Sequence, residues 1–495
     1  MTRKTLKIAL VSAAAMLITL TAGVVVASTK AKAELPEYLG PQACIGCHSD
    51  KFLSWETSLH ANFVTEIKTV ADLPADPSGL SPELQDELAA AKYVFHGNRF
   101  LTPDLVTGEL KYVGVEYDDK KQEYVASTRK GSSWDASCGG CHAGKDFQSG
   151  IRTSIGVGCE SCHGPARDHV LGRGDRSKIS VSVDPSESCA ACHSGFNTKA
   201  GAARFPVGYR PGMNLEEIGF IPATVDASKP AQPQHHKGAY PQWKASAHAG
   251  AAATLNNNPG AKDRCYGCHS TTFINANEAG QPISVKDHPV DDGVTCVTCH
   301  DPHGSANEKQ LKKPAKELCT SCHTGEPTPT GFAPGKEVHH PQAEMLAGVA
   351  AIGIAPTEGP HTPVSCEECH MTGGNHLFKV VKPGEVIGTT TKDTCTTCHT
   401  NSTPEVRDVY LSMWQESVEA KLEALKADIA VVDTALKANP SGLADELKAS
   451  YAAAKTNFSM VEADASKGAH NFEYAIKILT AAKKDIRAAK EALGK

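Results

Sequence analysis

The sequence predicts a mainly α-helical protein with much irregular structure. One five-residue pattern, Cys-x-x-Cys-His, occurs nine times and uses all 18 cysteines. The 495 residues leave only about 55 for each copy, although the length alone would predict two to four conventional domains. From Thr403 onward the composition changes to Ala, Lys, Glu and Leu with helical periodicity. We therefore expect many short elements around the pattern, followed by long helices.

The Cys-x-x-Cys-His pattern is typical of covalent attachment of c-type haem. Two thiols one short turn apart suit the two vinyl groups of one haem, and the next residue places an imidazole under the iron. Half of a zinc site and a disulfide framework are the alternatives, but neither requires a histidine after every pair. We predict nine haem c groups with their iron, numbered as motifs one to nine. The attached cysteines would be Cys44, Cys47, Cys138, Cys141, Cys159, Cys162, Cys189, Cys192, Cys265, Cys268, Cys296, Cys299, Cys319, Cys322, Cys366, Cys369, Cys395 and Cys398. The proximal iron ligands would be His48, His142, His163, His193, His269, His300, His323, His370 and His399.

The remaining histidines are numerous enough to bind the second face of every iron. Of 22 histidines, 13 are not in a motif. The adjacent pairs 235–236 and 339–340 would each supply at most one ligand, which leaves eleven positions for nine irons. The expected distal ligands are His60, His169, His236, His248, His303, His340, His361, His376 and His470. An ordinary hydrogen-bonded histidine is the alternative for each, and His96 and His288 fit either interpretation.

An internal repeat indicates two related haem-binding halves. The phrase Trp55-Glu-Thr-Ser-Leu-His60-Ala resembles Trp243-Lys-Ala-Ser-Ala-His248-Ala. We expect a first haem domain at 34–200 with motifs one to four and a linker at 201–234. A second haem domain at 235–402 would carry motifs five to nine, followed by a helical segment at 403–495.

Local signals predict the regular elements. Ser81 and Pro82 are typical of a helix start and predict a short helix over 81–92. Short apolar runs separated by Gly and Asp predict a small β-hairpin or meander over 93–127. Thr403 and Pro404 begin a helix that ends at Asn439, and a second helix is expected from Leu443 past His470 to the C-terminus. The apolar face of the first helix would comprise Val406, Tyr410, Met413, Leu422, Leu425, Ile429, Val432 and Leu436. The two helices would form a long antiparallel hairpin or an oligomer interface; a charged helical tail without a partner is the alternative.

Residues 1–33 have the pattern of a secretory signal. Arg3, Lys4 and Lys7 precede an apolar run over 8–27, and Ala31-Lys32-Ala33 has the form cleaved by signal peptidase. A retained membrane anchor is the alternative. We expect export across the inner membrane to the periplasm, the cell surface or the exterior. Removal of this segment takes five of the 50 basic residues and leaves 56 acidic ones, a net charge of −11, which argues against a nucleic-acid partner.

The ordered motifs resemble those of the multihaem cytochrome c superfamily. They are Trp-x-x-Ser-x-His-Ala, Cys-His-Gly-Pro, Cys-His-Asp-Pro-His, Cys-His-Met with a later Asn-His, and a C-terminal Gly-Ala-His-Asn. The superfamily includes ammonia-forming nitrite reductases, octahaem tetrathionate and hydroxylamine enzymes, and the tetrahaem cytochrome of ammonia oxidisers. The resemblance implies a mostly helical, haem-packed fold with stacked haem pairs, and a homodimer through the C-terminal helices. In the nitrite reductases the catalytic motif usually ends in Lys, whereas all nine motifs here end in His.

Two functions are compatible with these observations. The first is an electron-transfer protein with mostly bis-histidine haems of low potential. Its partners would be other cytochromes, quinol-linked donors or an extracellular metal acceptor. The second is an oxidoreductase that reduces nitrite, hydroxylamine or a sulfur oxyanion at one five-coordinate haem, with catalytic residues that the sequence does not identify. We expect the first.

Overall fold

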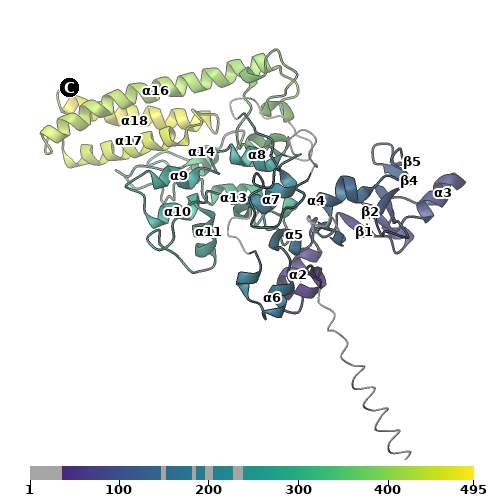
Figure 1. Ribbon diagram of the computed structural model, residues 1–495. Coiled ribbons are helices and arrows are strands. Elements are labelled where there is room, and N and C mark those ends of the chain that lie inside the picture. Colours follow the sequence, from purple (N-terminus) through teal and green to yellow (C-terminus); the bar gives the residue numbers. More distant parts are fainter. Residues whose placement is uncertain (1–35, 146–151, 181–185, 196–204, 227–237) are drawn as a thin grey trace, which may run out of the picture.

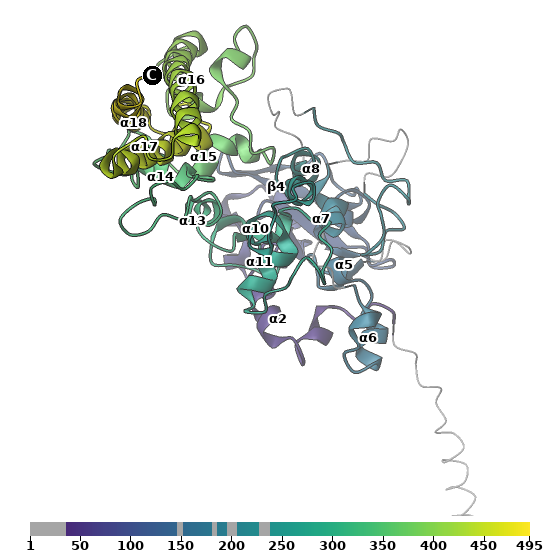
Figure 2. The ribbon, with the colours of Figure 1, turned by 90° about the vertical axis from the view of Figure 1, so that its left-hand side faces the viewer.

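The fold places a small β-sheet unit and three long helices at opposite ends of a body of short helices (Figure 1). In a view turned by 90° the three long helices lie at the upper left, and the fainter sheet lies behind the body of short helices (Figure 2). The computed structural model describes residues 36–145, 152–180, 186–195, 205–226 and 238–495. The predicted class, mainly helical with much irregular structure, is confirmed. The expected signal segment and His236 lie outside the described residues. Among the helices of the described residues, none is long and apolar enough to cross a membrane.

The short helices carry or flank the nine motifs. Motif one lies between a 3-10 turn at Pro41–Cys44 and α2, and motif nine lies on a 3-10 turn at Thr394–Thr397. The bounds of the short α-helices are α2 Ser49–Glu56, α3 Pro82–Ala89, α4 Gly140–His142, α5 Glu160–His163, α6 Arg167–Leu171, α7 Ser186–His193, α8 Ala239–Lys244, α9 Ala251–Asn256, α10 Asp263–His269, α11 Thr271–Glu278, α12 Cys296–Cys299, α13 Ala315–Thr320, α14 Gln342–Ala347 and α15 Cys366–His370.

The β-sheet unit is an antiparallel meander in the order β1-β2-β3-β4-β5, as predicted for 93–127 with one further strand. Alternate residues face opposite sides: Phe95 packs with Trp134 beside motif two, whereas Val94 packs with Leu88 of α3. The sheet therefore covers one side of motif two. Strand bounds are β1 Val64–Glu66, β2 Tyr93–Phe95, β3 Arg99–Pro103, β4 Leu110–Asp118 and β5 Glu123–Ala126; β6 Gly144–Lys145 and β7 Arg152–Ser154 form a separate pair.

The C-terminal segment contains three long helices, α16 Pro404–Ala438, α17 Asp445–Asp464 and α18 Phe472–Ala492. The predicted start of α16 after Thr403 is confirmed. The predicted continuous second helix is wrong, because the chain turns between α17 and α18. Ala465 and Gly468 have φ of 58° and 92°, which the helix does not permit. Asn471 then caps α18 by accepting a hydrogen bond from the Tyr474 amide.

The predicted apolar face of α16 is buried over only part of its length. Val418, Leu425 and Val432, seven residues apart, are buried against the shorter helices α17 and α18. Val406, Tyr410 and Met413 are 47%, 55% and 52% exposed, contrary to the expectation of one continuous buried face. The reason is length, because α16 has 35 residues and its partners have 20 and 21. The dimer expected through these helices stays a prediction.

The Gly- and Pro-rich segment before the second half is part of the protein core where it is described. Tyr209, Leu215 and Phe220 are buried in one cluster with Ala190 of α7 and Tyr240 of α8. This part of the expected linker therefore packs between the halves.

A buried ion pair joins motif nine to α16. The Arg407 guanidinium donates to Asp393 Oδ2 at 2.5 Å and to the His399 carbonyl at 3.0 Å. Both side chains are nearly inaccessible, with 8% and 0% exposed. Burial alone would raise the pKa of Asp393, but hydrogen bonds from Arg407 and Thr396 hold the pKa below its usual value. The ion pair therefore stabilises the fold above about pH 4, the pKa of an unfolded Asp, and this contribution is lost as the pH falls through the lower folded pKa.

We expect Arg407→Ala to lower the free energy of unfolding by about 3–5 kcal/mol at pH 7, because it leaves the buried Asp393 carboxylate without its partner. Urea unfolding followed by circular dichroism at the helix band measures this loss. The matched control on the same helix is Lys426→Ala, which breaks an exposed pair with Glu462 and should cost less than about 1 kcal/mol. Equal losses for the two variants would contradict the assigned importance of the buried pair.

Candidate haem centres

The backbone of a motif closes one helical turn. The amide of the motif histidine donates to the carbonyl of the first cysteine at 2.9 Å for His48, 3.0 Å for His163 and 2.8 Å for His399. His300 and His323 make the same bond. This turn holds both thiols and the imidazole of a motif together, so the arrangement depends on five residues alone.

The cysteine side chains are compatible with covalent attachment. All 18 lie in described residues and all are free of disulfide bonds. Thiols of different motifs lie close enough together to shift each other's pKa in four places. These contacts are Cys44 with Cys159, Cys192 with Cys141, Cys268 with Cys322, and Cys319 with Cys366. Because the thiols mark the edge of each attachment site, motifs one and three, two and four, five and seven, and seven and eight are immediate neighbours.

Every motif histidine lies against a second histidine ring. In seven pairs the ring centroids are 6.1–6.4 Å apart: His48–His169, His193–His60, His163–His303, His323–His248, His300–His376, His399–His361 and His370–His470. Two imidazoles on opposite sides of one metal ion, each at about 2.0 Å, have centroids roughly 6.2 Å apart. The spacing therefore fits one iron between each pair.

Motif two has a closer pair. The His142 and His96 centroids are 5.1 Å apart and nearly perpendicular, at 81°. Phe63 and Phe95 lie within 5.2 Å of both rings, so the site is lined by aromatic side chains. His96 directly follows β2 and has φ of 51°, in the turn that it forms with Gly97. Sequence reasoning left His96 undecided, because a strand-end histidine beside glycine has no distinguishing pattern.

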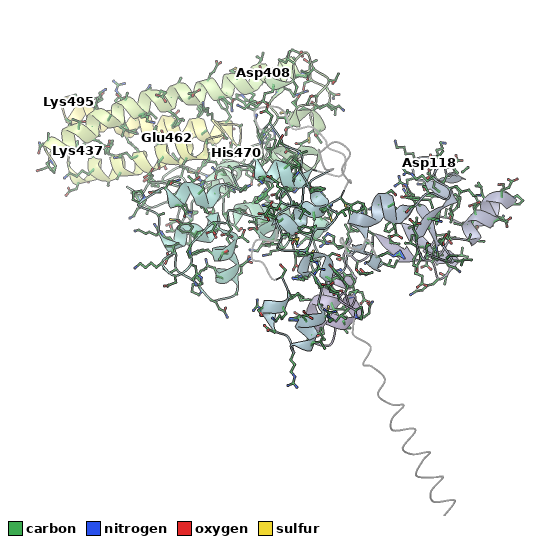
Figure 3. All side chains as sticks on the ribbon, viewed as in Figure 1. Asp118, Asp408, Lys437, Glu462, His470 and Lys495 are labelled. Carbon is green, nitrogen blue, oxygen red and sulfur yellow. The ribbon has the colours of Figure 1, made fainter. Side chains whose placement is uncertain are left out.

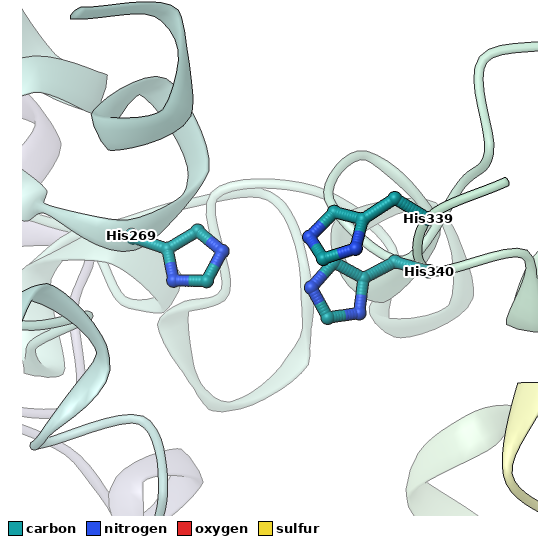
Figure 4. Close-up of side chains that lie close together, drawn as sticks. All are labelled: His269, His339 and His340. Carbon is teal, nitrogen blue, oxygen red and sulfur yellow. The ribbon is translucent and has the colours of Figure 1, made fainter. Parts of the chain in front are cut away.

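Motif five faces two candidate partners (Figure 4). The ligand atoms of His269, His339 and His340 all lie within 4.8 Å of one another. The His269 and His340 centroids are 5.8 Å apart. His339 is exposed, and its ring is 3.9 Å from that of His340. One of these two histidines can bind an iron held by His269, as expected for adjacent residues. Within the described parts of the chain, no other histidine ring lies against that of His288.

Hydrogen bonds orient the paired rings. Nδ1 lies 2.9 Å from a backbone carbonyl in His163, His300, His169 and His376. A carbonyl oxygen can only accept, so Nδ1 carries the hydrogen and Nε2 keeps a free lone pair, the form that binds metal. His470 differs, because its Nδ1 lies 2.6 Å from Asp464 Oδ1. Sequence reasoning missed Asp464, since a continuous helix would place it away from His470.

Burial favours the neutral form of several paired histidines, because it lowers the pKa of His60, His163 and His323. Burial, followed by neighbouring imidazoles, lowers the pKa of His248 to about 4, and burial with His339 and His323 does the same for His340. For His470 burial also lowers the pKa, but the Asp464 carboxylate outweighs it and raises the pKa above the usual value. Neutral imidazole is the ligand form, so the donor set of these pairs fits haem iron.

The repeated tryptophan phrases make identical contacts in the two halves. Trp55 Nε1 donates to the Val157 carbonyl at 2.9 Å, and Trp243 Nε1 donates to the Val294 carbonyl at 2.7 Å. Each valine amide returns a bond to the histidine carbonyl of the same phrase. The preceding Gly156 and Gly293 touch the phrase so closely that a Cβ would lie 2.2 and 2.4 Å from a carbonyl oxygen. The dipeptide Gly-Val, which begins three residues before the first cysteine of motifs three and six, could therefore have extended the repeat in the sequence.

These sites define the class of the protein: a c-type cytochrome that holds several covalent haems through Cys-x-x-Cys-His motifs. Three family descriptions match parts of the chain: cytochrome c552 over residues 333–495, cytochrome c554 and c-prime over 110–164 and 233–301, and doubled CXXCH motif over 288–328.

Known proteins show the same relationship over most of the chain. The crystal structure of the outer cell wall cytochrome OcwA matches this chain with 29% sequence identity and a TM-score of 0.76. The match covers 91% of this chain and 100% of the OcwA chain. The undecahaem cytochrome from the S-layer of Carboxydothermus ferrireducens shares the fold at 23% identity, with a TM-score of 0.63, covering 94% of this chain and 71% of its own. The multihaem cytochrome MtrA of Shewanella baltica (strain OS185) is 25% identical over 343 residues, 63% of this chain and 87% of MtrA. The chain belongs to the multihaem cytochrome c superfamily.

Proposed function

We propose that this protein is a nonahaem cytochrome that conducts electrons through closely spaced, mostly bis-histidine haems. The observation that carries the proposal is the second histidine opposite every motif histidine, seven of them at 6.1–6.4 Å. When bound, each haem supplies an iron that takes up and releases one electron. The protein residues hold the groups in sequence, exclude water and keep the potential low through a second imidazole.

Contacts between motifs support a continuous order. The close thiols of Cys44 and Cys159 support motif one beside motif three, and those of Cys319 and Cys366 support motif seven beside motif eight. The electrostatic interaction of Cys162 with Cys192 supports contact between motifs three and four. That of His300 with His60 supports contact between motifs six and four, because His60 faces the motif-four histidine. Electrostatic interactions of Cys299 with Cys319 and of Cys398 with Cys369 likewise support contact of motif six with seven and of motif nine with eight. We infer the order one, three, four, six, seven, eight, nine, with motif two attached to four and motif five attached to seven.

The two halves are joined within this order. His303, seven residues after the first cysteine of motif six, belongs to the second half. Its ring plane is within 8° of that of His163 in motif three. His60 of the first half lies 3.5 Å from the Pro302 carbonyl. Side chains of one half therefore lie at motifs of the other, which supports a single conducting path across the molecule.

We propose a location outside the cytoplasm, with an external electron acceptor or a partner cytochrome. The secretory pattern of residues 1–33 supports export. The names of OcwA and of the Carboxydothermus ferrireducens protein describe an outer cell wall and an S-layer cytochrome. This role would place one end of the haem order at the donor and the other at the acceptor.

A second candidate function, reduction of nitrite, hydroxylamine or a sulfur oxyanion, is favoured by the geometry of motif two. The 5.1 Å separation of His96 and His142 is about 1 Å shorter than two ligands of one metal need. If His96 stays off the iron, this haem is five-coordinate and has a free position between aromatic side chains.

The experiment that tests the proposal is low-temperature electron paramagnetic resonance of the oxidised protein, with a pyridine haemochrome count. We expect nine haems per chain and only low-spin ferric signals. A high-spin signal that shifts on addition of nitrite or hydroxylamine would instead support the reductase, and His96→Ala would then leave that signal unchanged. Fewer than nine haems would contradict the proposed number.

A further inference from the structure

We propose that Asp464 is a positioning residue that lowers the reduction potential of the motif-eight haem through its hydrogen bond to His470. The inference rests on the proposed function, in which His370 and His470 hold one iron. Their ring centroids are 6.3 Å apart, as expected for that role. Asp464 would set how readily this single site accepts an electron from its neighbours in motifs seven and nine.

The turn between α17 and α18 places the carboxylate. Asp464 is the last residue of α17, and its side chain is 0% exposed. One carboxylate oxygen lies 2.6 Å from His470 Nδ1, and the other accepts a hydrogen bond from the Ser466 hydroxyl. The Ser466 hydroxyl also accepts from the His470 amide at 3.2 Å.

The backbone of this turn is unusual for its residue types. Ala465 and Lys467 both have positive φ, 58° and 52°. Such residues tolerate that conformation only where surrounding contacts enforce it, and they occur often at functional sites. Gly468, with φ of 92°, packs so tightly that a Cβ would lie 3.1 Å from Val418 of α16. Figure 3 shows His470 at the end of the long helices that faces the body of short helices. The three helices thus fix the carboxylate and the imidazole together.

Among the described residues, Asp464 differs in charge and burial from the other groups that contact Nδ1 of a paired histidine. The Nδ1 atoms of His163, His300, His169, His376 and His370 lie 2.9–3.2 Å from backbone carbonyls, which are neutral. His303 has a carboxylate neighbour, Asp301, but at 3.3 Å and with both side chains about one-third exposed. Water weakens that second interaction, whereas the buried Asp464 acts at low dielectric.

The chemical consequence follows from charge. A carboxylate that accepts the Nδ1 hydrogen makes the imidazole a stronger electron donor to its metal. Iron(III) gains more from this donation and from the nearby negative charge than iron(II). Reduction, in which one electron passes from a neighbouring haem to this iron(III) and no proton moves, therefore becomes less favourable. We expect the motif-eight haem to be reduced last in the second half.

The test is Asp464→Asn, which keeps the shape and an oxygen acceptor but removes the charge. We expect nine low-spin haems and one redox component whose oxidised-to-reduced ratio, at a fixed potential, falls about tenfold; for one electron this equals 59 mV. Asp464→Glu should restore most of the original value. Asp301→Asn is the matched control, with a change of less than about threefold because that pair is partly exposed.

His470→Ala separates this inference from the function on which it rests. If His470 is an iron ligand, this variant converts one haem to high spin. A high-spin His470→Ala variant together with an unshifted Asp464→Asn would overturn the role of Asp464 alone. A low-spin His470→Ala variant would overturn the ligation as well. A high-spin Asp464→Asn variant would show that Asp464 only holds the ring, and would also overturn the proposed lowering of the potential.

Discussion

Replacement of Cys319 and Cys322 by serine is expected to divide the haem order into two electrically separate parts. The variant loses the haem of motif seven, which in the proposed order lies between motifs six and eight. With the protein fixed to an electrode through a C-terminal tag, all haems of the unmodified chain should exchange electrons in fast film voltammetry. In the variant only those of motifs eight and nine should do so, because electron tunnelling falls off steeply across the gap.

The matched control is the double serine variant of Cys265 and Cys268 in motif five. Its second thiol meets Cys322 of motif seven, so we infer that this haem is a side branch. Both variants should contain eight haems by pyridine haemochrome, but the motif-five variant should keep all eight in rapid exchange. Equal behaviour of the two variants would contradict the proposed order.

His303→Ala is expected to convert one of nine haems from low spin to high spin without loss of any covalent haem. The His303 ring lies 6.2 Å from that of His163 and parallel to it, and no change in the Cys-x-x-Cys-His motif is involved. Loss of the second imidazole should also raise the potential of that haem. Electron paramagnetic resonance and a redox titration measure both effects.

The control for this prediction is His288→Ala, because within the described residues no histidine ring lies against His288. It should leave nine low-spin haems and an unchanged titration. An unaltered spectrum of His303→Ala would refute its role as a ligand, and a high-spin His288→Ala variant would show that the assigned pairs are incomplete.

Much of the architecture could be predicted because it depends on neighbouring residues. Ser81 and Pro82 mark the start of α3, Thr403 marks the start of α16, and short apolar runs gave the meander from β2 to β5. The C-terminal turn could not be predicted from these signals. Alanine is a good helix former, but Ala465 adopts a left-handed conformation that only the packing of α17 against α18 enforces. The exposed start of α16 likewise depends on where its shorter partners end.

The sequence by itself determined where haem is attached, because a Cys-x-x-Cys-His motif closes its own helical turn and brings two thiols and one imidazole together within five residues. It also showed that enough histidines exist for a second ligand at every iron. Only the tertiary structure decided which histidine faces which motif, such as His60 with motif four and His303 with motif three. The second histidine at a site comes from a distant part of the chain, and no periodic pattern in the sequence identifies it. Which histidine faces which motif therefore depends on how the whole chain packs.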